Sequence, residues 1–523
     1  MKKLIKLTYL TAILVVFSNF LFAQKATWGK VQTSESKHYH PYILGEDSKG
    51  IYTFARVKRD IVIEKFNRKS KDKEFSVVID PPKIGKYKVV LEDVELIKDK
   101  FLVFASYYDK EKKETNLFAY TYSSENGKKL DQKIELFNIE VEKRRRDGNF
   151  MVMTSPDRTK ILINHYAYYR KEKKYRDKYV LLDENLNKLL DKDEEIVKSE
   201  KDYSTYNYII DNDGSIFFMK KYSFTENYIT TYDANKSFEK WEEKIILDDL
   251  KSDESITNVD FTINKENQLV VTGYYSKKNQ LYGCFFTKID NLTKEIIVTK
   301  LNKFDEDFKK QFLSNRKLKK GKDGKIYNIF DNIEIITKDD GGIILIGEMA
   351  QHTYYYDHNG NYRGEVVMYN DMIALNISAE GTLIWGHKIP KRQYYYYMLD
   401  YYPIVIGSFG VRLFVYPTDY PDYFSYLAGI NDKELVIVFN DNLKNLEKGD
   451  NDKLKKMKNI NSSVAMCYKI NLEDGKKNKK ILYDIKNINV LLQPSVSFQF
   501  DQESDIIIFG KKKKKFKYGT LDI

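Results

Sequence analysis

The sequence predicts an all-β protein built from repeated four-stranded units. Three observations support this prediction: aromatic side chains are abundant while proline is scarce, hairpin signatures recur along the chain, and helical periodicity is nearly absent. The 523 residues include 42 Tyr and 30 Phe but only 9 Pro. Because aromatic side chains suit the half-buried, pleated surface of a strand, this composition favours β-structure.

The first 23 residues match a secretory signal peptide. Three lysines among the first six residues precede an apolar stretch, 10–22, and Ala23 is the expected last residue before cleavage. Leu21 is bulkier than the small residue usual at its position, so an uncleaved anchor is the alternative. No later stretch is long and apolar enough to span a bilayer. We therefore expect an exported protein that is periplasmic, associated with the outer membrane or secreted.

Eight short segments have the pattern of a β-hairpin. In each, an apolar stretch leads into a tight turn rich in Asp, Asn, Lys and Gly and then into a second apolar stretch. The segments are residues 42–55, 94–107, 151–166, 208–221, 260–275, 333–348, 425–441 and 497–511. The first five turns are separated by about 51 to 57 residues.

Most of these hairpins are followed by a second pair of strands. The second pairs are residues 116–130, 179–190, 228–241, 284–298, 372–389 and 464–482. Four short strands in a period of this length are typical of one blade of a β-propeller. The sequence therefore predicts about eight four-stranded blades, with seven as the alternative count. Tandem β-sandwich domains are the alternative fold.

The two ends of the chain predict how the ring is completed. The last unit has room for about three strands, whereas residues 25–34 precede the first hairpin without a partner. We expect this N-terminal strand to complete the last blade, which would leave no open sheet edge. Residues 1–23 are then the signal peptide, and residues 24–523 form a single propeller domain.

Three longer segments interrupt the repeat near residues 305–328, 350–366 and 391–424. The clearest helical pattern, residues 304–320, lies at the first of them and predicts a short helix there. The other two segments are rich in Tyr and interrupt the same stretch of the repeat. We expect them to rise together over one face of the ring, since functional loops are commonly carried on a rigid scaffold.

On these hairpins and this period, the chain resembles the β-propeller superfamily, in particular exported propeller-like proteins of Gram-negative bacteria. The resemblance spans essentially the whole mature chain but rests on periodicity alone. The sequence contains no WD dipeptide set, no kelch glycine pair and no Asp-box series. No functional residue can therefore be carried over from those families.

A tyrosine cluster is the main candidate for a binding site. RQYYYYMLDYY, residues 392–402, holds six tyrosines among eleven residues, and three more stand at 354–356. Tyrosine combines a large rigid surface with a hydroxyl group and is enriched where proteins bind other molecules. The alternative is ordinary β-sheet packing, because the whole chain is rich in Tyr. The candidate ligand-binding residues are Tyr354, Tyr356, His358, Tyr395, Tyr397 and Tyr402.

These features favour an exported, non-catalytic binding or scaffold protein of the cell envelope with a protein or glycan partner. The rival is a secreted hydrolase or lyase acting on polysaccharide or peptide, using scattered acids or His352, His358 and His387. No G-x-S-x-G elbow, P-loop or H-E-x-x-H motif is present. The sequence therefore names no catalytic residue and implies no cofactor.

Clustered lysines suggest a third possibility, an envelope component that docks on an anionic surface. The net charge is +12, and much of the excess lies at residues 453–458, 476–480 and 511–517. The alternative is a solvated face or a frayed tail. Export makes nucleic acid the least expected partner. The surface with the densest charge would consist of Lys511, Lys512, Lys513, Lys514 and Lys515.

The two cysteines, Cys284 and Cys467, fit no metal-binding spacing, so no structural metal site is expected. An oxidising compartment would permit a disulfide between them. Two cysteines in a chain of this length are more often small buried apolar residues.

Overall fold

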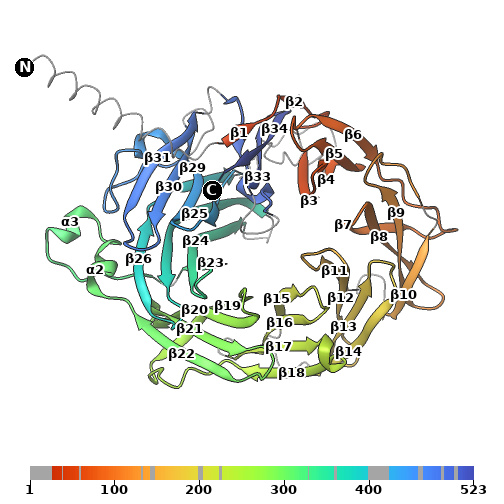
Figure 1. The fold of residues 1–523 in the computed structure, drawn as a ribbon, viewed down its shortest axis with the longest axis horizontal. Helices are drawn as coiled ribbons and strands as arrows, with labels where there is room; N and C mark the ends of the chain where they lie inside the picture. Colours follow the sequence, from red (N-terminus) through yellow and green to blue (C-terminus); the bar gives the residue numbers. More distant parts are fainter. Residues whose placement is uncertain are drawn as a thin grey trace, which may run out of the picture.

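A computed structural model describes most of the chain between residues 26 and 522 (Figure 1). Eight antiparallel sheets follow one another around a ring, and each runs from a strand near the centre to one at the rim. This is a β-propeller with eight blades, as the repeat predicted. The structure does not describe residues 1–25, 38, 58–59, 131–132, 142–147, 198–203, 223–225, 328, 358–361, 399–422, 458–462, 485–487, 500–504 and 523. The segment expected to be a signal peptide is among these residues.

The first four blades each contain four strands that are consecutive in the sequence. Blade 1 consists of β3 (His40–Glu46), β4 (Gly50–Val57), β5 (Asp60–Asn67) and β6 (Lys73–Val78). Blade 2 consists of β7 (Val89–Ile97), β8 (Lys100–Asp109), β9 (Glu114–Ser123) and β10 (Ile134–Glu140). Blade 3 consists of β11 (Asn149–Thr154), β12 (Lys160–Tyr169), β13 (Lys174–Asp183) and β14 (Lys188–Val197). Blade 4 consists of β15 (Ser204–Ile210), β16 (Ile216–Lys221), β17 (Asn227–Asp233) and β18 (Glu239–Lys244).

The other four blades follow the same plan, with additions in blades 6 and 8. Blade 5 consists of β19 (Glu254–Ile263), β20 (Gln268–Lys277), β21 (Gln280–Asp290) and β22 (Ile296–Lys303). Blade 6 consists of β23 (Phe330–Thr337), β24 (Ile343–Tyr356), β25 (Tyr362–Ile377), β26 (Leu383–Ile389) and the added β27 (Gln393–Met398). Blade 7 consists of β28 (Leu427–Ile430), β29 (Glu434–Asn442), β30 (Ser463–Asn471) and β31 (Lys477–Asp484). Blade 8 consists of β32 (Leu491–Leu492), β33 (Ile506–Lys512), β34 (Lys515–Leu521) and two N-terminal strands, β1 (Ala26–Trp28) and β2 (Gln32–Thr33).

Buried apolar side chains fill the space between successive blades. Side chains alternate along a strand, so Ile373 and Leu375 of β25 pack towards blade 5 while Met372 and Ala374 pack towards blade 7. Eight apolar clusters of this kind each join two neighbouring blades. Because both faces of a blade are buried at its middle, its two central strands, such as β8 and β9, are buried almost continuously rather than at every second residue.

The N-terminal strand belongs to the last blade, as the sequence predicted. In the antiparallel pair of β1 and β34, Ala26 lies opposite Leu521. The first and last blades also share a core cluster, in which the rings of Phe66 and Tyr518 lie 4.4 Å apart. The two ends of the described chain therefore meet in one sheet.

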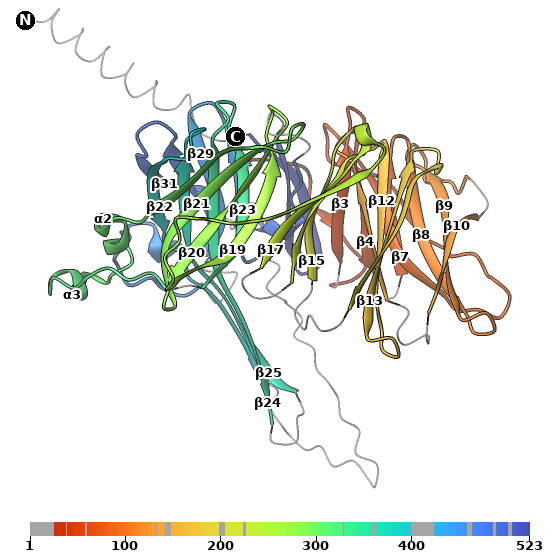
Figure 2. The ribbon, with the colours of Figure 1, turned by 90° about the horizontal axis from the view of Figure 1, so that it is seen from below.

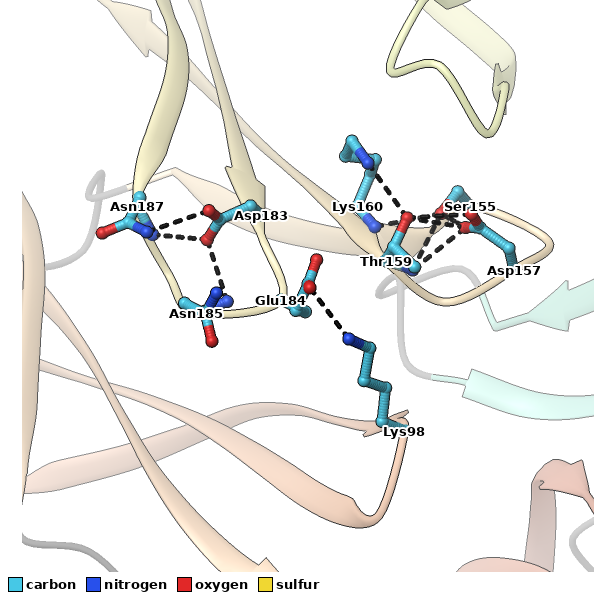
Figure 3. A network of polar contacts seen from close by, with 9 residues as sticks. All are labelled: Lys98, Ser155, Asp157, Thr159, Lys160, Asp183, Glu184, Asn185 and Asn187. Atoms are coloured by element: carbon cyan, nitrogen blue, oxygen red, sulfur yellow. Dashed lines mark hydrogen bonds and ion pairs between the residues drawn. The ribbon is translucent and has the colours of Figure 1, made fainter.

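The turns of neighbouring blades are linked by polar contacts (Figure 3). Lys98, in the β7–β8 turn, forms an ion pair of 2.8 Å with Glu184 in the β13–β14 turn. Asp157 accepts hydrogen bonds from Thr159 within its own turn, and its backbone N–H donates to Asn212 of blade 4 at 3.0 Å. These contacts fix the turns at one face of the ring.

The helical segment between blades 5 and 6 contains two short helices, α2 (Glu306–Lys310) and α3 (Asn315–Leu318), where one was expected. Asp305 caps α2 by accepting a hydrogen bond of 2.7 Å from the backbone N–H of Phe308. Phe308 is buried in the core between blades 5 and 6. Within the described residues, neither helix has the length and apolar character needed to cross a membrane.

The hairpin formed by β24 and β25 is longer than the blade that carries it. These strands have 14 and 16 residues, and β23 pairs with β24 only as far as Met349. Beyond that point the hairpin leaves the ring and projects from one face (Figure 2). Residues 350–356 and 362–366, within the segment that the sequence suggested as an insertion, are therefore a continuation of two blade strands.

Candidate binding arm

The projecting part of blade 6 is a three-stranded sheet, which we call the arm. It consists of residues 350–356 of β24, residues 362–369 of β25 and the whole of β27. The central strand is β25, since it pairs with β24 on one side and with β27 on the other. At about 3.3 Å per residue, seven residues of β24 reach roughly 23 Å from the ring.

One face of the arm carries His352 and Tyr354. Their rings lie 4.2 Å apart, and His352 Nε2 lies 2.7 Å from a carboxylate oxygen of Glu365 on the neighbouring strand. In the register of the sheet, Tyr395 lies beside Val367 on this same face. Both pack against the core between blades 7 and 8, so the base of this face is joined to the ring.

The opposite face carries Tyr355, Tyr394 and Tyr396, because neighbouring residues of a strand point to opposite sides. The ammonium of Lys456 lies 3.7 Å from the centre of the Tyr394 ring. This is a close cation–π contact. It ties the start of β27 to the loop that precedes β30.

Exposed tyrosine is concentrated on the arm. Of the six tyrosines that are exposed in the described part of the chain, four lie here: Tyr354, Tyr355, Tyr356 and Tyr396, with 50%, 42%, 60% and 56% of their surface accessible. Tyrosines elsewhere are largely used for packing, and Tyr39, Tyr120, Tyr179, Tyr274 and Tyr518 are fully buried. Packing therefore accounts for most of the described tyrosines, while binding stays a prediction for those exposed on the arm.

A buried ion pair lies where the arm joins the ring. Lys391, just before β27, contacts Glu348 of β24, and both side chains are 0% exposed. Burial lowers the pKa of the Lys391 ammonium well below its usual value, because a charge is costly away from water. The rings of Tyr369, Tyr426 and Phe439 surround the ammonium at 5.6 to 5.9 Å.

Further polar groups at this junction form hydrogen bonds with one another. Ser425 donates its hydroxyl proton to Glu348 at 2.7 Å and its backbone N–H to the Gln393 side chain at 2.8 Å. The Gln393 amide in turn donates to the Asn440 carbonyl at 2.8 Å. Burial raises the pKa of nearby Asp441 to about 7. Blades 6 and 7 thus hold the base of the arm through specific contacts rather than through apolar packing alone.

The structure brings together part of the predicted tyrosine set. Tyr354 and Tyr356 are exposed on the arm, and Tyr395 is half-buried at its base. Tyr397 belongs to β27, paired with Glu365, while His358 and Tyr402 lie outside the described residues. Sequence reasoning singled out neither Lys391 nor Glu348, because a buried ion pair leaves no local pattern in a chain with 31% charged residues.

Two of the three histidines proposed for a hydrolase, His352 and His387, lie within the described residues and have separate partners. His352 contacts Glu365 on the arm, whereas His387 of β26 bonds to the Gly475 carbonyl of blade 7 at 2.7 Å. Burial lowers the pKa of His387 below its usual value. His352 and His387 are thus each engaged in a contact of their own, while His358 lies outside the described residues. Among the residues that the structure describes, no group of three or more His, Cys, Asp or Glu side chains is placed to hold a metal ion.

The lysine run near the C-terminus forms an ordered hairpin. Lys511 and Lys512 end β33, Lys515 begins β34, and Lys513 and Lys514 form the turn between them. Lys511 donates to the Tyr39 carbonyl at 2.8 Å, which ties this hairpin to blade 1. The frayed-tail interpretation was wrong, while the partner of this surface stays a prediction.

Both cysteines are buried free thiols. Cys284 belongs to the core between blades 5 and 6 and Cys467 to the core between blades 7 and 8. Burial raises their pKa values to about 12 and about 11, respectively. They serve as small apolar core residues, the second of the two expectations from the sequence.

Comparison by sequence finds no protein-family model that matches the chain. A search of curated proteins also finds no match. Comparison of structures finds the WD40 domain of SCAP from fission yeast, with a TM-score of 0.38, 8% identity and 96% of both chains covered. It also finds the polysaccharide lyase Uly1, with a TM-score of 0.38, 10% identity and coverage of 95% of this chain and 99% of that one. The Dos1 propeller matches with a TM-score of 0.32, 7% identity and coverage of 79% and 90%.

The class of the protein follows from its own topology. It is an eight-bladed β-propeller in which one hairpin of blade 6 is extended into an arm that carries exposed tyrosines. Similarities at these TM-scores add no argument about its function.

Proposed function

We propose that this chain is an exported, non-catalytic binding or scaffold protein of the cell envelope, and that the arm contacts its protein or glycan partner. The observation that carries the proposal is the exposure of Tyr354, Tyr355, Tyr356 and Tyr396 on one projecting sheet. Exposed aromatic side chains gathered in one place are typical of interaction sites. Export rests on the signal-peptide pattern of residues 1–23.

The base of the arm supports this proposal. Lys391, Glu348 and Gln393 are buried and matched with partners, so the arm is held at a defined position on the ring. A preorganised surface loses less conformational entropy on binding than a floppy loop. Tyrosine suits such a surface because its ring is rigid and its hydroxyl group can bond to peptide or sugar groups.

The test compares two double variants in capture from the solubilised envelope fraction of the native organism. Tyr356→Ser/Tyr396→Ser changes the arm, whereas Tyr42→Ser/Tyr327→Ser changes two tyrosines elsewhere that are 58% and 63% exposed. We expect the first variant to lose a captured component that the wild type and the second variant retain. Equal capture by all three proteins, at equal melting temperature, would contradict the proposal.

A further inference from the structure

A concave surface lies on the opposite face of the ring from the arm. It is a groove of about 910 Å³. The β23–β24 turn contributes Lys338, Asp339 and Asp340 to its lining, and this turn stands at the other end of β24 from the arm. A volume of this size lies within the range of small-molecule sites. The groove is therefore independent of the binding arm.

The charge of the groove is opposite to that of the whole chain. Three lysines line it, Lys265, Lys338 and Lys433. Two of them are neutralised locally, since Lys265 pairs with Asp339 at 2.7 Å and Lys338 with Asp340 at 3.1 Å. The groove is thus an acidic surface on a protein whose net charge is +12. Its lining includes six carboxylates, of which Asp339 and Asp340 are used in these two ion pairs and four are left: Asp432, Glu473, Asp505 and Asp522.

These carboxylates are spread along the groove. Asp339 and Asp432 come from the first turns of blades 6 and 7, Glu473 from the β30–β31 turn, and Asp505 and Asp522 from the open end of the β33–β34 hairpin in blade 8, where Ile506 pairs with Leu521. Such spacing suits an extended ligand that carries several positive charges. Ile384, Ile430 and Leu472 line the same groove, and apolar side chains of this kind can cover aliphatic segments between charges.

A buried acceptor in the wall points to the same ligand chemistry. Asn376 is 1% exposed, and its amide nitrogen donates to the Leu472 carbonyl at 2.7 Å. Its side-chain oxygen has no hydrogen-bond partner among the described residues. A buried acceptor without a donor destabilises the fold, because it has lost its hydrogen bonds to water. Asn376 lines the groove, and an N–H donor that reached this oxygen would remove that cost.

We infer that this groove binds alkylammonium groups, as carried by a polyamine or by successive lysine side chains of a peptide. The acidic residues supply electrostatic attraction, the apolar residues contact the methylene segments, and Asn376 supplies an acceptor. A chain with several ammonium groups would satisfy all three features, whereas an anion would meet repulsion.

Calorimetric titration with spermidine and with tetralysine tests this inference, and the two ligands distinguish a free polyamine from a peptide. We expect saturable binding of at least one of them to the wild type. Asp432→Asn/Glu473→Gln/Asp505→Asn should raise its Kd roughly tenfold, since each exposed charge contributes a fraction of a kcal/mol. The matched control, Asp248→Asn/Asp323→Asn/Glu125→Gln, removes the same charges from exposed positions elsewhere.

The inference would be overturned by either of two results. One is the absence of saturable binding of both ligands to the wild type. The other is an equal loss of affinity in the groove variant and in the control, which would show attraction to overall charge only. Circular dichroism of both variants checks that the fold is retained, and Lys433→Gln provides a second variant, expected to tighten binding because it removes a positive charge from the groove.

Discussion

Lys391 and Glu348 form an ion pair at the junction of the arm and the ring, and neither side chain is exposed to solvent. Removing one partner of such a pair leaves the other charge buried and uncompensated. We expect Lys391→Met to lower the free energy of unfolding by roughly 3–5 kcal/mol. Chemical denaturation monitored by circular dichroism measures this loss.

The double variant Lys391→Met/Glu348→Leu separates the ion pair from the packing around it. The double variant leaves no unpaired charge in the interior. Its free energy of unfolding should therefore be well above that of Lys391→Met alone. If the loss of stability in the double variant equalled the sum of the losses in the two single variants, the two residues would not be coupled.

Glu95, on β7, is expected to make the stability of the protein depend on pH. Burial, with a smaller contribution from the charge of Asp93, raises its pKa to about 8, although Arg158 acts in the opposite direction. Between about pH 5 and 8 the folded chain therefore retains a proton that the unfolded chain has released, so stability contributed by this group falls as pH rises. Between about pH 5 and 8, we expect the free energy of unfolding to decrease by at least about 1 kcal/mol less in Glu95→Gln than in the wild type. An unchanged slope would mean that Glu95 titrates normally.

Trp28 tests the role of the N-terminal strands in blade 8. Its ring packs edge-on against Tyr483 at 5.4 Å and covers Gly510 and Gly519 of β33 and β34. We expect Trp28→Ala to cost roughly 3 kcal/mol in the free energy of unfolding. Lys30→Ala, two residues later and with a largely exposed side chain, is the control and should be near neutral. Similar stabilities of the two variants would argue against a structural role for β1.

The two thiols should be inert in the folded protein. Because Cys284 and Cys467 are buried and their pKa values are raised, neither forms much thiolate at pH 8. We expect iodoacetamide to label neither residue in the native protein and both in denaturant, as measured by mass spectrometry. Rapid labelling of either cysteine without denaturant would show that its blade interface opens.

The sequence predicted the propeller because its signals are local and repeated. Each hairpin carries its own turn, as at Gly341, whose φ of 80° few other residues adopt easily. The expected pairing of an N-terminal strand with the last blade followed from counting strands, and β1 opposite β34 confirms it. Both features needed only short-range patterns and the requirement that sheet edges be covered.

The arm was harder to predict. Residues 350–357 and 362–369 are rich in β-formers and flank an Asn-Gly pair in the sequence, so a hairpin signal was present, but the fixed period favoured an insertion. The contact of Lys391 with Glu348 joins residues 43 positions apart, and that of Lys456 with the Tyr394 ring joins a loop of blade 7 to β27. Such contacts depend on how blades stack, which no local pattern encodes.

Oxidative footprinting of the tyrosines tests the central claim most directly. Hydroxyl radicals modify exposed side chains, so the wild-type protein can be compared alone and with the solubilised envelope fraction of the native organism. The account predicts that Tyr354, Tyr355, Tyr356 and Tyr396 become protected while Tyr42 and Tyr327 remain reactive. Protection of Tyr42 and Tyr327 with unchanged reactivity on the arm would contradict it.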